Sequence, residues 1–181
     1  MSAIHVCPLE KLNHVLAISG PCRLLTLCGP GKETAPPSHA EHGFLQLVFN
    51  DINEPREGLI APDESHVKAI IDFVTIWDRK VPLVIHCWMG ISRSTAAALI
   101  ASAALYPQAP AEGLASLLRS KSPMATPNRL MVEHADTILG RKGELVDAVD
   151  AIGRGQDAML GEPFTIALGE LRALSDAMAA T

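Results

Sequence analysis

The stretch VPLVIHCWMGISRSTAAALIASAAL, residues 81–105, decides the fold. It opens as a short apolar run that ends in His86 and Cys87, which is typical of a strand buried on both faces of a sheet. A short loop containing Gly90 follows, and the alanine-rich run that starts near Arg93 predicts a helix. The stretch therefore predicts a strand, a tight loop and a helix in the interior of an α/β domain.

The flanking sequence extends this pattern. Further strands are predicted at 4–7, 23–28 and 44–49, separated by a helix at 8–18 and by loops at 29–43 and 50–63. Helices are predicted at 64–79, 111–120, 127–139 and 143–152. We expect a mainly parallel central sheet of about four to five strands flanked by helices. Residues 1–153 are expected to form one domain, with the segment 154–181 unplaced but packed on it.

Composition excludes several classes of protein. The chain has 181 residues, 48% of them hydrophobic, and a formal net charge of −5, so a basic face for nucleic acid is not expected. It has four cysteines without a CxxC pair and no charged, hydrophobic leader, which argues against a disulfide-rich secreted protein. The longest near-apolar run, 95–105, is shorter than the roughly 20 residues that span a bilayer. We expect a soluble cytoplasmic protein without a membrane partner.

The segment HCWMGISRS, residues 86–94, carries the chemistry. Five residues separate a thiol at Cys87 from a guanidinium at Arg93, and a short strand-to-helix loop can point its N–H groups at one centre. Gly90 permits the curl that such a loop needs. The amides, the helix N-terminus and Arg93 all favour the thiolate of Cys87, and Ser94 can donate a hydrogen bond to its sulfur. The loop suits a tetrahedral oxyanion next to a sulfur nucleophile.

This segment resembles the His-Cys-x-x-Gly-x-x-Arg-Ser/Thr loop of the cysteine-dependent protein tyrosine phosphatase superfamily, and GISRS resembles its small dual-specificity branch. The resemblance implies a phosphatase-like three-layer fold and a cysteinyl-phosphate formed on Cys87. It implies that Arg93 binds phosphate, Ser94 assists the sulfur, and His86 shapes the loop and tunes the thiol. The implied phosphate-binding loop comprises Trp88, Met89, Gly90, Ile91, Ser92 and Arg93. No cofactor or metal is expected.

The resemblance also bears on the substrate. Family members that act on inositol lipids tend to carry lysines in this loop, and the loop has none here, which favours a phosphoprotein over a lipid. Small organic phosphates remain open. The chain has no separate tyrosine-depth loop like that of the larger tyrosine-specific enzymes, so the choice between phosphotyrosine and phosphoserine or phosphothreonine stays open.

The leaving oxygen needs a proton donor, which neither Cys87 nor Arg93 supplies. The acidic candidates in the preceding loop are Asp51, Glu54, Glu57, Asp63 and Glu64. Asp63 and Glu64 are explained as the cap and first turn of the next helix. Asp51 directly follows a strand end, where parallel sheets assemble their sites, and VFNDINEP resembles the family's acid segment. We select Asp51, with Glu54 as runner-up and Asn128 as a supporting residue suggested by the resemblance at 122–128.

Two other functions fit a cysteine loop at a strand end: a rhodanese-like sulfur transferase and a non-catalytic phosphate-binding module. The five intervening residues and Arg93 favour phosphate over sulfur, and the nucleophile and arginine together favour catalysis. His39 and His42 lack a third metal ligand and are interpreted as loop residues. Cys28 is either a core cysteine or a partner for a disulfide with Cys87 under oxidation.

Overall fold

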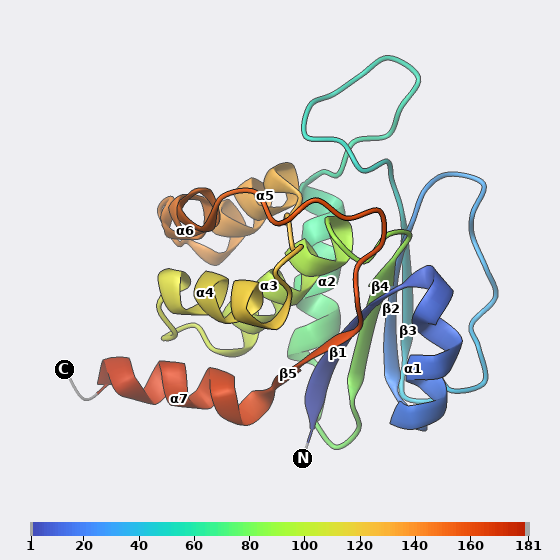
Figure 1. Ribbon diagram of the computed structural model, residues 1–181, viewed down its shortest axis with the longest axis horizontal. Helices are drawn as coiled ribbons and strands as arrows, with labels where there is room; N and C mark the ends of the chain where they lie inside the picture. Colours follow the sequence, from blue (N-terminus) through green and yellow to red (C-terminus); the bar gives the residue numbers. More distant parts are fainter. Residues whose placement is uncertain (1, 180–181) are drawn as a thin grey trace.

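A computed structural model describes residues 2–179 of the chain. Its centre is a five-stranded sheet with the order β3-β2-β4-β1-β5 (Figure 1). The strands are β1 (Ala3–Pro8), β2 (Arg23–Cys28), β3 (Phe44–Val48), β4 (Leu83–Cys87) and β5 (Phe164–Ala167). The first four are parallel, and β5 is antiparallel to β1. The predicted α/β fold with a mainly parallel sheet is confirmed.

Helices cover both faces of the sheet. A short 3-10 helix η1 (Leu9–Lys11) leads into α1 (Leu12–Ser19), whose Val15 and Leu16 pack on one face beside Leu24 of β2. The other face carries the larger core. Its helices are α2 (Glu64–Thr75), α3 (Arg93–Leu105), α4 (Ala111–Lys121), α5 (Arg129–Leu139) and α6 (Glu144–Ile152). The resulting order of layers is α1, the sheet, and a group of helices around α3 (Figure 1).

Helix α3 lies at the centre of this helical group. Every residue from Arg93 to Leu105 except Ala104 is buried, and α3 contacts β4, α2, α4 and α5. A helix enclosed on all sides has no polar face, which explains why the run 93–105 lacks an amphipathic period. Its small alanine side chains let several neighbours approach closely. The N-terminus of α3 is thereby fixed against the end of β4.

Helix α2 begins as predicted and ends early. The Asp63 carboxylate accepts hydrogen bonds from the backbone N–H groups of Ser65 and His66 at 2.9 and 3.1 Å, which confirms the predicted cap. The helix stops at Thr75, so the predicted end at 79 is wrong. Arg79 has a φ of 62°, a left-handed conformation that no helix continues through. Trp77 keeps its helical spacing in sequence but is buried outside the helix.

The C-terminal part of the predicted tail is an integral part of the sheet layer. After α6, residues 153–163 cross the helical side and lead into β5, which adds an edge strand next to β1 (Figure 1). Helix α7 (Leu168–Ala179) follows and is tied to α4 by an ion pair between Glu170 and Lys121 at 2.7 Å. Of the predicted tail, residues 180 and 181 lie outside the described residues. Within residues 2–179, no helix has the length and apolar character needed to cross a bilayer.

Candidate active site

The loop between β4 and α3, residues 87–93, curls around the thiol of Cys87. The Gly90 backbone N–H donates to Cys87 Sγ at 3.2 Å, and Ser94 Oγ lies 3.1 Å from the same sulfur. Gly90 has a φ of 72°, and a Cβ there would lie 2.7 Å from the backbone nitrogen of Pro8. Only glycine fits both the conformation and the space. The structure therefore brings Cys87, Gly90 and Ser94 together around one sulfur atom.

Three of the four cysteines, Cys7, Cys22 and Cys28, have a raised pKa. Burial raises the pKa of Cys7 to about 12, and a negative charge on Cys87 adds to that shift. Burial also raises the pKa of Cys22, to about 11, and that of Cys28. These three side chains therefore remain thiols at neutral pH. Among them only Cys28 shares a cavity with Cys87, and its thiol faces the carbonyl oxygen of Leu47 at 3.7 Å. All four cysteines are free.

Arg93 opens α3 and is 6% exposed. One terminal nitrogen donates to the carbonyl oxygen of Phe49 at 3.0 Å, which fixes the guanidinium against the end of β3. Its Nε is buried, lies 3.7 Å from Asp51 Oδ2, and makes no hydrogen bond within residues 2–179. A buried guanidinium with a spare donor at a helix N-terminus provides a fixed positive charge for an oxyanion.

Asp51 follows β3 and is held by the loop and by α5. Ser92 Oγ donates to Asp51 Oδ1 at 2.7 Å, and Asn128 Nδ2 donates to the same oxygen at 2.9 Å. Arg93 Nε lies near the other carboxylate oxygen, Oδ2, so the carboxylate is fixed at the edge of the site, while the Asp51 side chain is 33% exposed. Glu54 is exposed and forms no hydrogen bond or ion pair with the part of the chain that is described. The structure thus brings Asp51, and not Glu54, to Arg93.

Asn128 joins three parts of this arrangement. It is the N-cap of α5, where its side-chain oxygen accepts from Met131 N at 3.1 Å. Its amide nitrogen contacts Asp51 and the carbonyl oxygen of Ile52, and its backbone N–H donates to Ser92 O at 3.3 Å. The residue singled out by resemblance therefore links the helix α5, the segment that contains Asp51 and the cysteine loop.

His86 supports the loop from the opposite face of the sheet. Its Nε2 lies 2.8 Å from Thr26 Oγ1 of the neighbouring strand β2. Burial lowers the pKa of His86 to about 4, and the nearby charge of Arg93 acts in the same direction, so the ring is neutral at pH 7. A neutral, hydrogen-bonded ring at this position fixes the end of β4 directly before Cys87.

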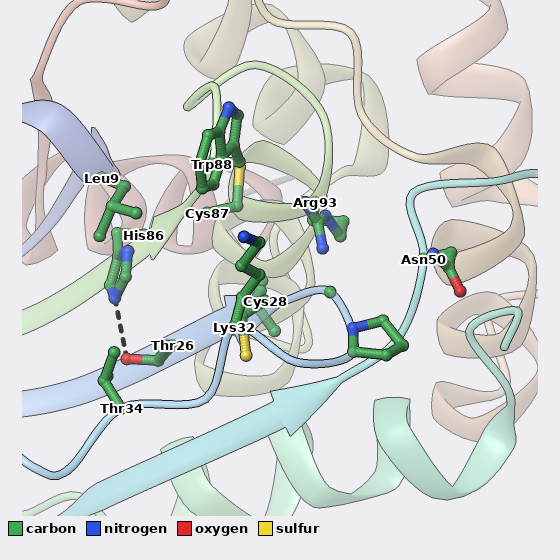
Figure 2. A pocket seen from close by; sticks show the side chains of 13 residues that line it. Leu9, Thr26, Cys28, Lys32, Thr34, Asn50, His86, Cys87, Trp88 and Arg93 are labelled. Carbon is green, nitrogen blue, oxygen red and sulfur yellow. Dashed lines mark hydrogen bonds between the residues drawn. The ribbon is translucent and has the colours of Figure 1, made fainter. Parts of the chain in front are cut away.

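Of the remaining loop residues, Trp88 lines the cavity, whereas Met89 and Ile91 hold the loop in place through their backbones. Trp88 is 53% exposed and lines a cavity of about 310 Å³ together with Cys87 and Arg93 (Figure 2). Met89 and Ile91 instead use their carbonyl oxygens to accept from Gly161 N and Thr126 N, at 2.8 and 2.9 Å. Trp88 therefore borders the cleft, whereas the carbonyl groups of Met89 and Ile91 tie the loop to the segments that contain Gly161 and Thr126.

The segment 153–163, which we call the strap, is a support that sequence analysis missed. Gly161 lies so close to the loop that a Cβ there would be 2.8 Å from the Gly90 oxygen. At the other end of the strap, Gly155 packs on Met124, and Arg119 donates to the carbonyl oxygens of Ile152 and Gly153 at 3.0 and 2.8 Å. The signal available in the sequence was the run GRGQDAMLG, with three glycines in nine residues.

The described residues contain no group of three or more His, Cys, Asp or Glu side chains arranged to hold a metal ion. His39 and His42 serve the loop through their backbones: the His39 oxygen accepts from Cys22 N at 2.8 Å, and His42 N donates to Cys22 O at 3.2 Å.

Comparisons with known proteins find similarity in structure alone. No family model matches the chain, and no curated protein matches its sequence. Among solved structures, DUSP15 superimposes with a TM-score of 0.58 and 13% identity, covering 84% of this chain and 91% of that one. Tk-PTP in its active form superimposes with a TM-score of 0.54 and 16% identity, covering 76% and 90% of the two chains. The chain therefore has the α/β fold of these phosphatase structures.

Proposed function

We propose that this protein is a phosphomonoester hydrolase of the protein tyrosine or dual-specificity phosphatase type, with a phosphoprotein substrate. One observation carries the proposal: Cys87 Sγ lies 3.2 Å from the Gly90 N–H and 3.1 Å from Ser94 Oγ, in a cavity that the buried Arg93 also lines. A sulfur anion and an adjacent oxyanion site are the two requirements for attack on a phosphate ester. The shared fold supports the same function.

In the first step, Cys87 Sγ attacks phosphorus and an S–P bond forms. The bond from phosphorus to the ester oxygen breaks, and its electron pair leaves with that oxygen, which takes a proton from Asp51. Arg93 and the loop N–H groups bind the three non-bridging oxygens, on which negative charge is concentrated. The products of this step are a free alcohol or phenol and a cysteinyl-phosphate.

In the second step, water attacks the phosphorus of the cysteinyl-phosphate and Asp51 accepts its proton. The S–P bond breaks, and the electron pair returns to Cys87 Sγ. Ser94, 3.1 Å away, donates a hydrogen bond to the sulfur as charge develops on it. Inorganic phosphate leaves, and the route requires no metal ion or cofactor.

Hydrolysis of an aryl phosphate in the presence of EDTA tests the proposal. Cys87→Ser is expected to lower kcat by at least about 10³-fold, and Arg93→Lys by about 10²-fold because lysine cannot form the two-point contact. Full activity in Cys87→Ser would refute the assignment of the nucleophile. Sulfur transfer from thiosulfate to cyanide, without phosphate release, would instead identify the rhodanese-like alternative.

Paired variants test the acid. Asp51→Asn is expected to lower kcat for an aryl ester by about 10²-fold and to flatten the alkaline limb of its pH profile. Glu54→Gln is the matched control and should remain close to wild type, because Glu54 forms no hydrogen bond or ion pair with the described residues. The reverse result would transfer the role to Glu54.

Trapping identifies the physiological substrate. A Cys87→Ser or Asp51→Ala variant is expected to retain phosphorylated proteins from a cell extract, and competition by phosphate should release them. We place this activity in a reducing cytoplasm, because Cys87 must stay a free thiol to act.

A further inference from the structure

Lys32 lies in the candidate site but has no part in the two steps above. It belongs to the loop 29–43 after β2, and its backbone N–H donates to Gly29 O at 3.1 Å, closing a tight turn. Figure 2 shows its side chain rising through the cavity with Nζ toward Cys87 and Arg93. The ammonium also lies over the ring of Trp88, with Nζ 6.0 Å from the ring centroid. A segment distant from the cysteine loop thus brings a second cation to it.

Within the described residues, Lys32 is not paired with a carboxylate in the way that Arg93 is, although Glu33 follows it in the sequence. Arg93 has Asp51 beside it, whereas Lys32 forms no ion pair there. Two cations that share a cavity repel each other unless anions separate them. The phosphoryl group that Arg93 and the loop amides bind accounts for one anion. Lys32 is then available to pair with a second anion.

The walls around Lys32 are largely apolar. Leu9, Pro30 and Trp88 line the same cavity, and Leu9 and Trp88 are 40% and 53% exposed at its mouth. Exposed apolar side chains around a polar centre are typical of a ligand-binding rim, and a ring can lie against the Trp88 indole. The cavity of about 310 Å³ is large enough for a substituted phenyl group beside the phosphoryl group.

On the basis of the proposed phosphatase activity, we propose that Lys32 forms a second anion subsite that selects aromatic phosphate esters carrying another negative charge near the phosphoryl group. The ring lies between Leu9 and Trp88, the phosphoryl group lies on the loop 87–93, and the second anion pairs with Lys32 Nζ. The same chemistry occurs in small acidic aryl phosphates and in phosphotyrosine next to an acidic residue.

Binding in the non-hydrolysing Cys87→Ser protein tests this subsite. Calorimetry with phenyl phosphate and 3-carboxyphenyl phosphate should show about fivefold tighter binding of the carboxylated ester, the range expected for a partly exposed ion pair. Adding Lys32→Gln should abolish that preference and leave phenyl phosphate within twofold. Lys80→Gln, an exposed lysine in the turn before β4, is the matched control and should keep the preference. About 0.5 M salt should reduce it in the parent protein.

Two outcomes would overturn the subsite. One is equal affinity of the Cys87→Ser protein for both esters; the other is an equal loss for both esters on adding Lys32→Gln, which would place Lys32 on the phosphoryl group itself. Binding is measured in the Cys87→Ser protein and turnover separately in the wild type. Binding with this preference, together with no hydrolysis of either ester by the wild type, would contradict the proposed function and support the subsite. If neither ester binds, both proposals fail. Two phosphotyrosine peptides that differ only in having Asp or Asn after the phosphotyrosine identify which kind of ligand supplies the second anion. A preference for the Asp peptide that depends on Lys32 indicates a peptide substrate, and no such preference indicates a small aryl ester.

Discussion

Replacing Gly161 with alanine tests whether the strap holds the cysteine loop in its active shape. The Gly161 N–H donates to Met89 O at 2.8 Å, and an added Cβ would lie 2.8 Å from Gly90 O and 3.1 Å from Met89 O. The loop or the strap must therefore move by a few tenths of an ångström. Overpacking of this kind costs about 1–3 kcal/mol, and weakening the hydrogen bond adds about 1 kcal/mol. We expect Gly161→Ala to lose about 2–4 kcal/mol of unfolding free energy.

The same displacement should reach the chemistry. The oxygen that the new Cβ contacts belongs to Gly90, whose own N–H lies 3.2 Å from Cys87 Sγ. Because misplacement of reacting groups by a fraction of an ångström lowers rates steeply, we expect kcat/KM for an aryl phosphate to fall by about tenfold. Urea unfolding followed by circular dichroism and initial-rate kinetics on the same samples measure both effects.

Gly169→Ala is the matched control for this experiment. A Cβ at Gly169 meets nothing within 4 Å, and alanine in α7 should leave stability equal or slightly higher and the kinetics unchanged. If Gly161→Ala retains wild-type stability and kcat/KM, the strap does not restrain the loop. If stability falls but kcat/KM does not, the strap supports the fold without shaping the site.

Three further predictions concern stability, pH and the acid. Burial lowers the pKa of His86 to about 4, so between pH 6.5 and 4 the unfolded chain binds one more proton than the folded protein. As the pH falls across that window, this group should lower the unfolding free energy by up to about 3 kcal/mol. His86→Gln should therefore show a shallower dependence of unfolding free energy on pH in urea unfolding, and an unchanged dependence would contradict the argument. Although burial opposes it, hydrogen bonds from the first turn of α2 lower the pKa of Asp63, so Asp63→Ala should lose about 1 kcal/mol at pH 7. The difference from wild type should begin to shrink as the pH falls below about 4 and be lost as it falls through the lowered pKa of the folded protein; a difference that does not change with pH would refute this reasoning. Asn128→Leu removes a donor to Asp51 and should lower kcat for an aryl ester by about tenfold with little change in KM; a selective rise in KM would place Asn128 on the substrate instead.

Sequence reasoning succeeded where the information is local. The continuous apolar run before Cys87, the glycine at position 90 and the alanine-rich helix lie within 25 consecutive residues, and their periods differ enough to separate strand, loop and helix. The cap at Asp63 is equally local, since it involves only the first turn of α2. The end of α2 was missed because Trp77 keeps a helical spacing although the backbone has already turned, and its burial comes from tertiary packing.

The candidate site was predicted less completely because it is assembled from the ends of several strands. In a parallel sheet the carboxyl ends of the strands lie at one edge, so the residues after β2, β3 and β4 meet there whatever their separation in sequence. A motif within the loop after β4 finds Cys87 and Arg93, and the strand end before Asp51 finds the carboxylate that lies beside Arg93. Sequence reasoning does not find Lys32, because a loop rich in glycine and proline has no periodic pattern from which the direction of a side chain can be predicted.

Lys32 also changes what the absence of lysines in the cysteine loop implies. That absence favoured a phosphoprotein on the assumption that the charge near the phosphoryl group is supplied by the loop 87–93 alone. The cavity instead receives a lysine from the loop after β2, whose Nζ faces Cys87 and Arg93 (Figure 2). The number of cations around a bound phosphate is therefore a property of the sheet edge, because each parallel strand that ends there contributes its own loop. For this reason substrate charge must be inferred from all the loops at that edge, and the ester pair that differs by one carboxylate measures it directly.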